Sequence, residues 1–141
     1  MSKQPSPGAH QLEAASVLLV EDDADTAELY ALWLRSEGHR VSIMSDAARA
    51  LILSPVLRPR VAVLDIGLPG LDGVELARRL QRMPQLAECQ YIAVTGYSDA
   101  QLQSRCLAAG IGAVLPKPVS RDALVENVGV ATRAPELAQR R

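Results

Sequence analysis

Residues 60–70 read Arg-Val-Ala-Val-Leu-Asp-Ile-Gly-Leu-Pro-Gly, and this stretch decides the fold class. The four apolar residues before Asp65 form a short run with β-branched side chains, which is typical of a strand buried on both faces of a parallel sheet. Two glycines and a proline follow, and they predict a loop directly after the strand. Ligands bind outside the carboxyl ends of strands in open α/β sheets, so Asp65 is placed for chemistry. A turn or a helix cap would also use an aspartate here.

The composition is that of one soluble globular domain of 141 residues, with 48% hydrophobic and 22% charged residues. A net charge of −1 offers no basic field for nucleic acid, and no apolar stretch reaches the length of a membrane span or the core of a signal peptide. We therefore expect a cytoplasmic domain that binds neither nucleic acid nor membrane. Cys89 and Cys106 lack metal-ligand spacing and are expected to be small core residues.

Five apolar runs alternate with five helical patterns, which predicts a parallel sheet with right-handed crossovers. The expected strands are 16–20, 40–44, 61–64, 91–94 and 113–115. The second helix is expected to cover 46–53 and to break at Pro55, whereas the last helix begins after Ser120 and ends at Gly129 and Pro135. These boundaries predict a flexible leader (1–15), one folded domain (16–131) and a short polar tail (132–141) without an output domain.

Polar residues follow four of the five expected strands and would meet on one rim of the sheet. They are Glu21, Asp22, Asp65, Thr95 and Lys117. Three carboxylates this close repel one another unless a cation shares them, and an all-oxygen site suits Mg²⁺. A carboxylate beside a divalent ion and an ammonium is a plausible nucleophile towards phosphorus, and a threonine hydroxyl can donate to a phosphoryl oxygen. Each of these residues, taken singly, also suits the end of a strand.

The scarcity of lysine in the sequence supports a specific role for Lys117. The chain has 13 arginines but only two lysines, Lys3 and Lys117, and Lys117 stands between two prolines. Arginine serves wherever a generic surface cation suffices, so a compact ammonium at Lys117 indicates a specific partner such as a phosphate.

With these residues in place, the sequence resembles the receiver domains of two-component response regulators. The likeness extends over residues 17–130 and rests on four motifs: Val-Leu-Leu-Val-Glu-Asp-Asp at 17–23, Leu-Asp-Ile-Gly-Leu-Pro-Gly-Leu-Asp-Gly at 64–73, Val-Thr-Gly at 94–96 and Lys-Pro at 117–118. The resemblance implies a flavodoxin-like, doubly wound parallel sheet in the order 2-1-3-4-5, flanked by five helices. It also implies a sensor histidine kinase or a histidine phosphotransfer protein as phosphodonor, and an unknown protein downstream.

The resemblance further implies a role for each residue of the rim. Asp65 would be the phosphoacceptor, Thr95 the switch hydroxyl, and Lys117 the lysine that pairs with the phosphoryl group through a loop containing a cis Lys117–Pro118 bond. The implied Mg²⁺ ligands are Asp22, Asp65 and the backbone carbonyl of Gly67, with Glu21 acting through a metal-bound water.

The sequence departs from the family pattern where receivers usually carry an aromatic residue three positions before the lysine. That position is Val114, and the only nearby aromatic residue is Tyr97, two residues after Thr95. We therefore predict that Tyr97 and its loop report the phosphorylated state, and that Tyr97 shields the phosphoryl group from water because Gly67 has no side chain to orient one.

Three other functions compete with a signalling phosphoacceptor that is not an enzyme. A Mg²⁺-dependent aspartyl-phosphate phosphatase or phosphotransferase similar to the haloacid dehalogenases would need an aspartate at the position of Gly67 as acid and base. A degenerate receiver would act only as an interaction module, an alternative that Val114 leaves open. A flavin-binding domain would need a hydroxyl-rich phosphate loop where this chain has Glu21 and Asp22.

Overall fold

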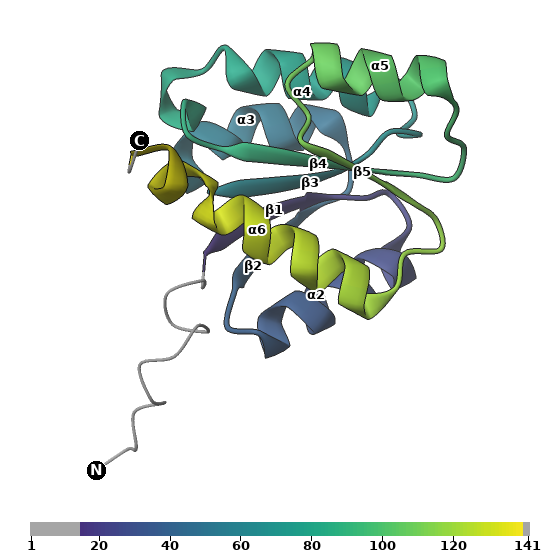
Figure 1. The fold of residues 1–141 in the computed structure, drawn as a ribbon. Helices are drawn as coiled ribbons and strands as arrows, with labels where there is room; N and C mark the ends of the chain where they lie inside the picture. Colours follow the sequence, from purple (N-terminus) through teal and green to yellow (C-terminus); the bar gives the residue numbers. More distant parts are fainter. Residues whose placement is uncertain (1–14, 140–141) are drawn as a thin grey trace.

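A five-stranded parallel sheet forms the centre of the molecule, and helices cover both of its faces (Figure 1). The computed structural model describes the backbone of residues 15–139 and the side chains of residues 15–133, so nearly all of the expected leader lies outside the described residues. The strand order β2-β1-β3-β4-β5 confirms the predicted doubly wound fold. The strands are β1 (Ser16–Val20), β2 (Arg40–Met44), β3 (Val61–Asp65), β4 (Gln90–Thr95) and β5 (Ala113–Pro116).

The helices divide between the two faces, with α3, α4 and α5 on one and α2 and α6 on the other (Figure 1). Their bounds are α2 (Ala24–Ser36), α3 (Ala47–Leu57), α4 (Gly73–Gln81), α5 (Ala100–Ala108) and α6 (Arg121–Gln139), with a short 3₁₀ helix η1 (Pro84–Leu86) before β4. None of the helices in the described part of the chain combines the length and the apolar character that a lipid bilayer requires of a spanning helix.

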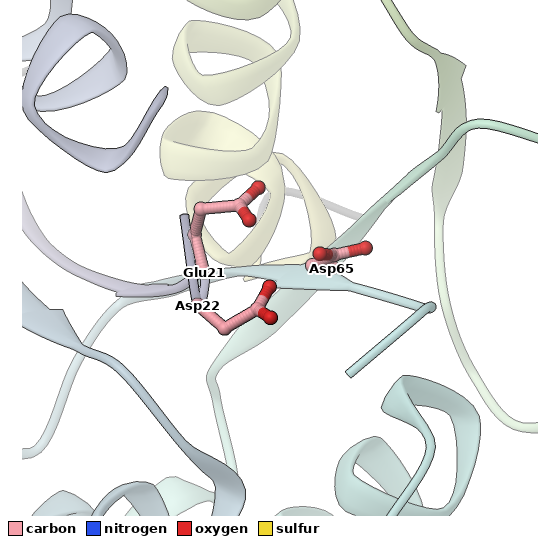
Figure 2. Close-up of side chains that lie close together, drawn as sticks. All are labelled: Glu21, Asp22 and Asp65. Carbon is pink, nitrogen blue, oxygen red and sulfur yellow. The ribbon is translucent and has the colours of Figure 1, made fainter. Parts of the chain in front are cut away.

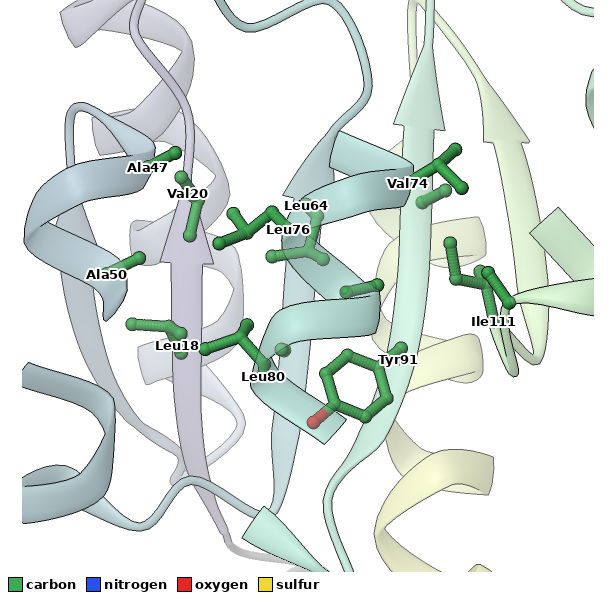
Figure 3. Close-up of a cluster of buried hydrophobic side chains, with 14 of the residues drawn as sticks. Leu18, Val20, Ala47, Ala50, Leu64, Val74, Leu76, Leu80, Tyr91 and Ile111 are labelled. Atoms are coloured by element: carbon green, nitrogen blue, oxygen red, sulfur yellow. The ribbon is translucent and has the colours of Figure 1, made fainter. Parts of the chain in front are cut away.

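The position of β3 at the centre of the sheet, with a core on each face, explains why its sequence is apolar without interruption. Its side chains alternate between the two faces, so that Ala62 and Leu64 join the core under α3 and α4 while Val61 and Val63 join the core under α2 and α6. Figure 3 shows Leu64 packed among the side chains of α4 and β1. All five residues of β3, including Asp65, are buried. The strand therefore holds Asp65 rigidly at its carboxyl end.

An aspartate begins each of the first four helices. The side chains of Asp23, Asp46, Asp72 and Asp99 each accept the backbone N–H of the residue three positions later, which satisfies a donor that the first helical turn leaves free. The hydroxyl of Ser120 accepts the N–H of Ala123 in the same way and confirms the predicted start of α6. These caps fix where the loops at the carboxyl end of the sheet end.

The predicted end of α3 is wrong, because the helix continues through Pro55 to Leu57. Proline removes one helical hydrogen bond at a cost of about 3 kcal/mol or more in a helix interior, but Pro55 lies in the last turn. Leu57 packs against the core, and the N–H of Arg58, in a left-handed conformation, closes the helix on the carbonyl of Ser54 at 2.8 Å. Packing and this cap outweigh the missing bond.

The predicted end of α6 is also wrong. The helix continues through Gly129 and Pro135 to Gln139, so the expected tail at 132–141 begins inside it. Thr132 is buried, and its hydroxyl donates to the carbonyl of Val128 at 2.8 Å. The guanidinium of Arg60 donates to the carbonyl of Thr132 at 2.8 Å and ties this part of α6 to the start of β3. Tertiary contacts thus hold the helix beyond its glycine.

Candidate functional site

The register of the sheet brings the polar strand ends together. Val20 of β1 pairs with Leu64 of β3, so the residues that follow them, Glu21 and Asp65, stand at the same level. An oxygen of Glu21, one of Asp22 and one of Asp65 all lie within 4.8 Å of one another, and Figure 2 shows the three carboxylates converging. We call these three residues the acidic cluster. Its members were predicted from the sequence, and the structure brings all three together.

Burial differs within the acidic cluster. Glu21 is 2% exposed and Asp65 is 6% exposed, whereas Asp22 faces solvent. Burial raises the pKa of Glu21 above its ordinary value, and the charge of Asp65 adds to this effect. Hydrogen bonds from the Asp23 amide, at 3.1 Å, and from Lys117 act in the opposite direction. The cluster therefore carries closely spaced negative charge that a cation would stabilise.

Lys117 supplies one such cation. Its ammonium nitrogen Nζ lies 3.1 Å from Oε1 of Glu21 and 3.3 Å from Oδ2 of Asp65. Burial alone would lower the pKa of Lys117, but its hydrogen bond with Glu21 and the charge of Asp65 outweigh that effect and raise the pKa. The lysine is thus held protonated between the carboxylates of Glu21 and Asp65. The Lys117–Pro118 bond is cis, as the resemblance implied.

The loop between β3 and α4 approaches Asp65 closely. The N–H of Gly67 donates to Oδ1 of Asp65 at 2.9 Å and fixes one carboxylate oxygen, leaving Oδ2 to Lys117. The N–H of Gly73 donates to the carbonyl of Ile66 at 3.2 Å, so the start of α4 rests on the same loop. The two oxygens of Asp65 therefore have different partners and different environments.

Thr95 lies at the end of β4, and its hydroxyl is engaged within its own loop. It donates to the carbonyl of Tyr97 at 2.5 Å and accepts the N–H of Tyr97 at 3.1 Å. The carbonyl of Thr95 accepts the N–H of Lys117 at 2.8 Å, which joins the ends of β4 and β5. Thr95 thus belongs to the predicted rim, but it makes no hydrogen bond with Asp65.

Tyr97 is linked in turn to the start of α5. Its hydroxyl donates to Oδ2 of Asp99 at 2.9 Å, while the other oxygen of Asp99 caps α5. Asp99 was not among the site residues predicted from the sequence, although a Ser-Asp pair before a helical stripe is a recognisable cap signal. A cavity of about 560 Å³ opens beside these residues, and its lining includes Gly67, Thr95, Tyr97, Asp99 and Arg105. The cavity therefore lies beside the acidic cluster, between the β3–α4 loop and α5, and is lined by the neighbours of Asp65 and not by Asp65 itself.

Comparison with known proteins identifies the family. The family model of the response regulator receiver domain matches residues 17–129. The chain is a response regulator receiver domain. Two curated relatives differ in how much of their length the chain covers. An uncharacterised 14.6 kDa protein of Leptolyngbya boryana is 33% identical over 108 residues, 77% of this chain and 82% of that protein. The sensor histidine kinase AruS of Pseudomonas aeruginosa is 38% identical over 136 residues, 94% of this chain but 14% of the kinase.

The receiver also resembles domains of solved structure. The CheY-like receiver domain protein of Methanospirillum hungatei superposes with a TM-score of 0.82 at 27% identity, covering 89% of this chain and 98% of that one. The signal receiver domain of a modulated diguanylate cyclase from Desulfovibrio desulfuricans gives a TM-score of 0.79 at 31% identity over 89% of this chain and 98% of that one. The receiver spans only small parts of several curated relatives, including 26% of a C4-dicarboxylate transport regulator of Pseudomonas aeruginosa.

Proposed function

We propose that this receiver accepts a phosphoryl group on the carboxylate of Asp65 and signals through the phosphorylated form. The observation that carries the proposal is the ammonium of Lys117, 3.3 Å from Oδ2 of Asp65 and paired at the same time with the buried Glu21. Phosphoryl transfer depends mainly on positioning and on neutralising charge, and this arrangement provides both.

The transfer is a displacement at phosphorus. An oxygen of Asp65 forms a bond to phosphorus while the bond from phosphorus to the donor breaks, and the leaving group keeps the electron pair and takes a proton from solvent. Lys117 holds the acceptor oriented and neutralises charge on the arriving group. Thr95 donates a hydrogen bond to a phosphoryl oxygen once its hydroxyl turns away from the carbonyl of Tyr97.

The acidic cluster fits Mg²⁺ because it offers only oxygen ligands and groups three carboxylates within 4.8 Å. In this proposal Asp22, Asp65 and the carbonyl of Gly67 hold the ion directly, and Glu21 holds it through a bound water. When bound, the ion neutralises charge on the transferred group.

The phosphodonor we propose is a histidine kinase or a histidine phosphotransfer protein, and the receiver then binds a downstream protein or passes the phosphoryl group on. The likeness to part of a sensor histidine kinase supports this donor class. Two free, buried cysteines, Cys89 and Cys106, support a reducing, cytoplasmic compartment. The position of Gly67, which offers no acid or base, argues against repeated turnover as a phosphatase.

Intact-mass measurement with acetyl phosphate tests the proposal. The wild-type chain should gain the mass of one phosphoryl group in the presence of Mg²⁺, and the gain should disappear in EDTA and in Asp65→Asn. Asp46→Asn, which changes a helix-cap carboxylate outside the site, is the matched control and should still be labelled. A phosphoryl group that is still gained by Asp65→Asn would refute the assignment of Asp65 as the acceptor.

We also propose that Tyr97 carries the phosphorylation signal in place of the usual aromatic residue. Val114 is a half-buried aliphatic residue packed against the core, whereas Tyr97 is joined through its backbone to the Thr95 hydroxyl and through its own hydroxyl to the cap of α5. Movement of Thr95 would therefore act on Asp99 and α5. Beryllofluoride, a phosphoryl mimic, should shift amide NMR signals around Tyr97, and Tyr97→Ala should speed dephosphorylation. Shifts confined to Val114 and an unchanged decay rate would contradict the assignment.

A further inference from the structure

The outward face of α3 carries exposed apolar side chains that neither core uses. Ile52 is 71% exposed, Leu53 40% and Val56 79%. With Arg49 they occupy positions i, i+3, i+4 and i+7, so all four lie along one face of the helix. Helix faces that meet water are normally polar, and a contiguous apolar face indicates an interaction site. We call Ile52, Leu53 and Val56 the α3 surface.

Two arginines lie at the carboxyl ends of α3 and of its neighbour α4. Arg58 caps α3, and Arg82 caps the neighbouring α4. The hydroxyl of Ser54 lies 3.9 Å from the sulfur of Met83, which places the carboxyl ends of the two helices side by side, as Figure 1 also shows. Within residues 15–133, no carboxylate lies within 4.0 Å of the guanidinium of Arg58 or Arg82. The charge of both arginines is therefore available to a partner.

We propose that the α3 surface binds an amphipathic helix of a partner protein whose apolar residues are flanked by carboxylates. The apolar side chains of the partner would cover Ile52 and Val56, and its carboxylates would meet Arg58 and Arg82, which matches the charge of this edge. The site lies away from the acidic cluster, because α3 descends from the carboxyl end of β2 to the amino end of β3. This inference therefore extends beyond the proposed phosphorylation and does not depend on it.

Two other occupants fit less well. A second copy bound through a two-fold axis would place the same surface against itself, and the basic residues around both surfaces would repel. A membrane surface attracts basic apolar helices, but it favours aromatic anchors at the interface, and the α3 surface consists of three aliphatic residues. An acidic amphipathic helix meets neither objection, because its carboxylates attract Arg58 and Arg82 and its aliphatic residues need no aromatic anchor.

Fluorescence anisotropy with two designed peptides tests the proposal. One is a helix of about 18 residues with leucines along one face and glutamates beside them, and the other has lysines in place of the glutamates. The wild-type receiver should bind the acidic peptide, more weakly as salt rises, and should bind the basic peptide at least tenfold more weakly. Ile52→Gln/Val56→Gln and Arg58→Glu/Arg82→Glu should each weaken acidic-peptide binding about tenfold or more.

Matched controls separate the α3 surface from general effects. Leu107→Gln removes an exposed leucine on α5, and Arg40→Glu reverses the charge of one exposed arginine at the start of β2, so both should bind the acidic peptide as wild type does. Arg58→Glu and Arg82→Glu as single variants, each with the same charge change as Arg40→Glu, should both bind it more weakly than Arg40→Glu does. Phosphorylation of Asp65 by acetyl phosphate should be unchanged in every variant, so failure of the phosphorylation proposal would be visible separately. Urea unfolding confirms that each variant is folded.

Several results would overturn the inference. Equal binding of both peptides, or no binding of the acidic one, would remove the charge argument. Concentration-dependent dimerisation in sedimentation that Ile52→Gln/Val56→Gln abolishes would assign the α3 surface to a second copy. Binding to vesicles of anionic lipid that the same double variant abolishes, without binding of the acidic peptide, would assign it to a membrane.

Discussion

Replacing Gly73 by alanine should destabilise the receiver, because the first residue of α4 lies directly against the backbone that carries Asp65. A Cβ atom at this position would stand 2.6 Å from the carbonyl oxygen of Asp65 and 2.9 Å from Cα of Ile66. Ordinary contact begins at 3.4 Å, so one of the two backbones must move by about 0.8 Å. Because every residue of β3 is buried, the movement falls on the β3–α4 loop and α4.

The size of the effect follows from two opposing contributions. Overpacking costs about 1–3 kcal/mol, and the better helix propensity of alanine returns up to about 1 kcal/mol. We therefore expect Gly73→Ala to lower the free energy of unfolding by about 1–2 kcal/mol in a urea titration followed by circular dichroism. Phosphorylation of Asp65 by acetyl phosphate should also slow, because the displaced loop includes Gly67, whose amide orients the Asp65 carboxylate.

Gly96→Ala is the matched control, because no atom lies within 4 Å of a Cβ built at Gly96. Its free energy of unfolding should stay within about 0.5 kcal/mol of the wild-type value. The reasoning fails if Gly73→Ala unfolds with the wild-type free energy, or if both variants lose the same amount.

Three further predictions concern the site and the core. Lys117→Arg should lose beryllofluoride-dependent NMR shifts although it keeps the charge, because a planar guanidinium cannot replace a compact ammonium between Glu21 and Asp65; wild-type shifts would refute this. About 10 mM Mg²⁺ should raise the free energy of unfolding by roughly 1.4 kcal/mol if the dissociation constant is near 1 mM, and Asp65→Asn should remove most of that gain in urea titrations. Burial raises the pKa of Cys89 from 9.0 to about 12, so the thiol of the unfolded chain ionises first as the pH rises. The free energy of unfolding should therefore fall between about pH 9 and pH 12. Thermal unfolding of Cys89→Ala should show a smaller loss of stability over the same pH range.

The fold and the acidic cluster could be predicted because both depend on patterns that the sequence displays directly. An apolar run ending in Asp65 requires a strand with two buried faces, and parallel pairing brings the ends of neighbouring strands to one edge. Glu21 therefore meets Asp65 whatever the details of packing. The scarcity of lysine pointed to Lys117 for a chemical reason, and the structure places its ammonium against both carboxylates.

The ends of two helices could not be predicted, because local signals there are weaker than tertiary packing. Pro55 and Gly129 are helix breakers in isolation, but packing of the half-buried Leu57 and burial of Thr132 extend both helices past them. The link from Tyr97 to Asp99 was missed for a different reason. It depends on the path of a loop that no periodicity in the sequence describes.

The hydrogen bond from the amide of Lys117 to the carbonyl of Thr95 has a mechanical consequence. The two side chains proposed to contact the phosphoryl group come from the ends of the neighbouring strands β4 and β5, whose backbones are joined there by this hydrogen bond of 2.8 Å. The backbone at the end of β4 therefore cannot shift far without moving the backbone at the start of the Lys117 loop, although each side chain keeps its own rotation. The position of edge strand β5 is thereby coupled to the backbone that carries Thr95.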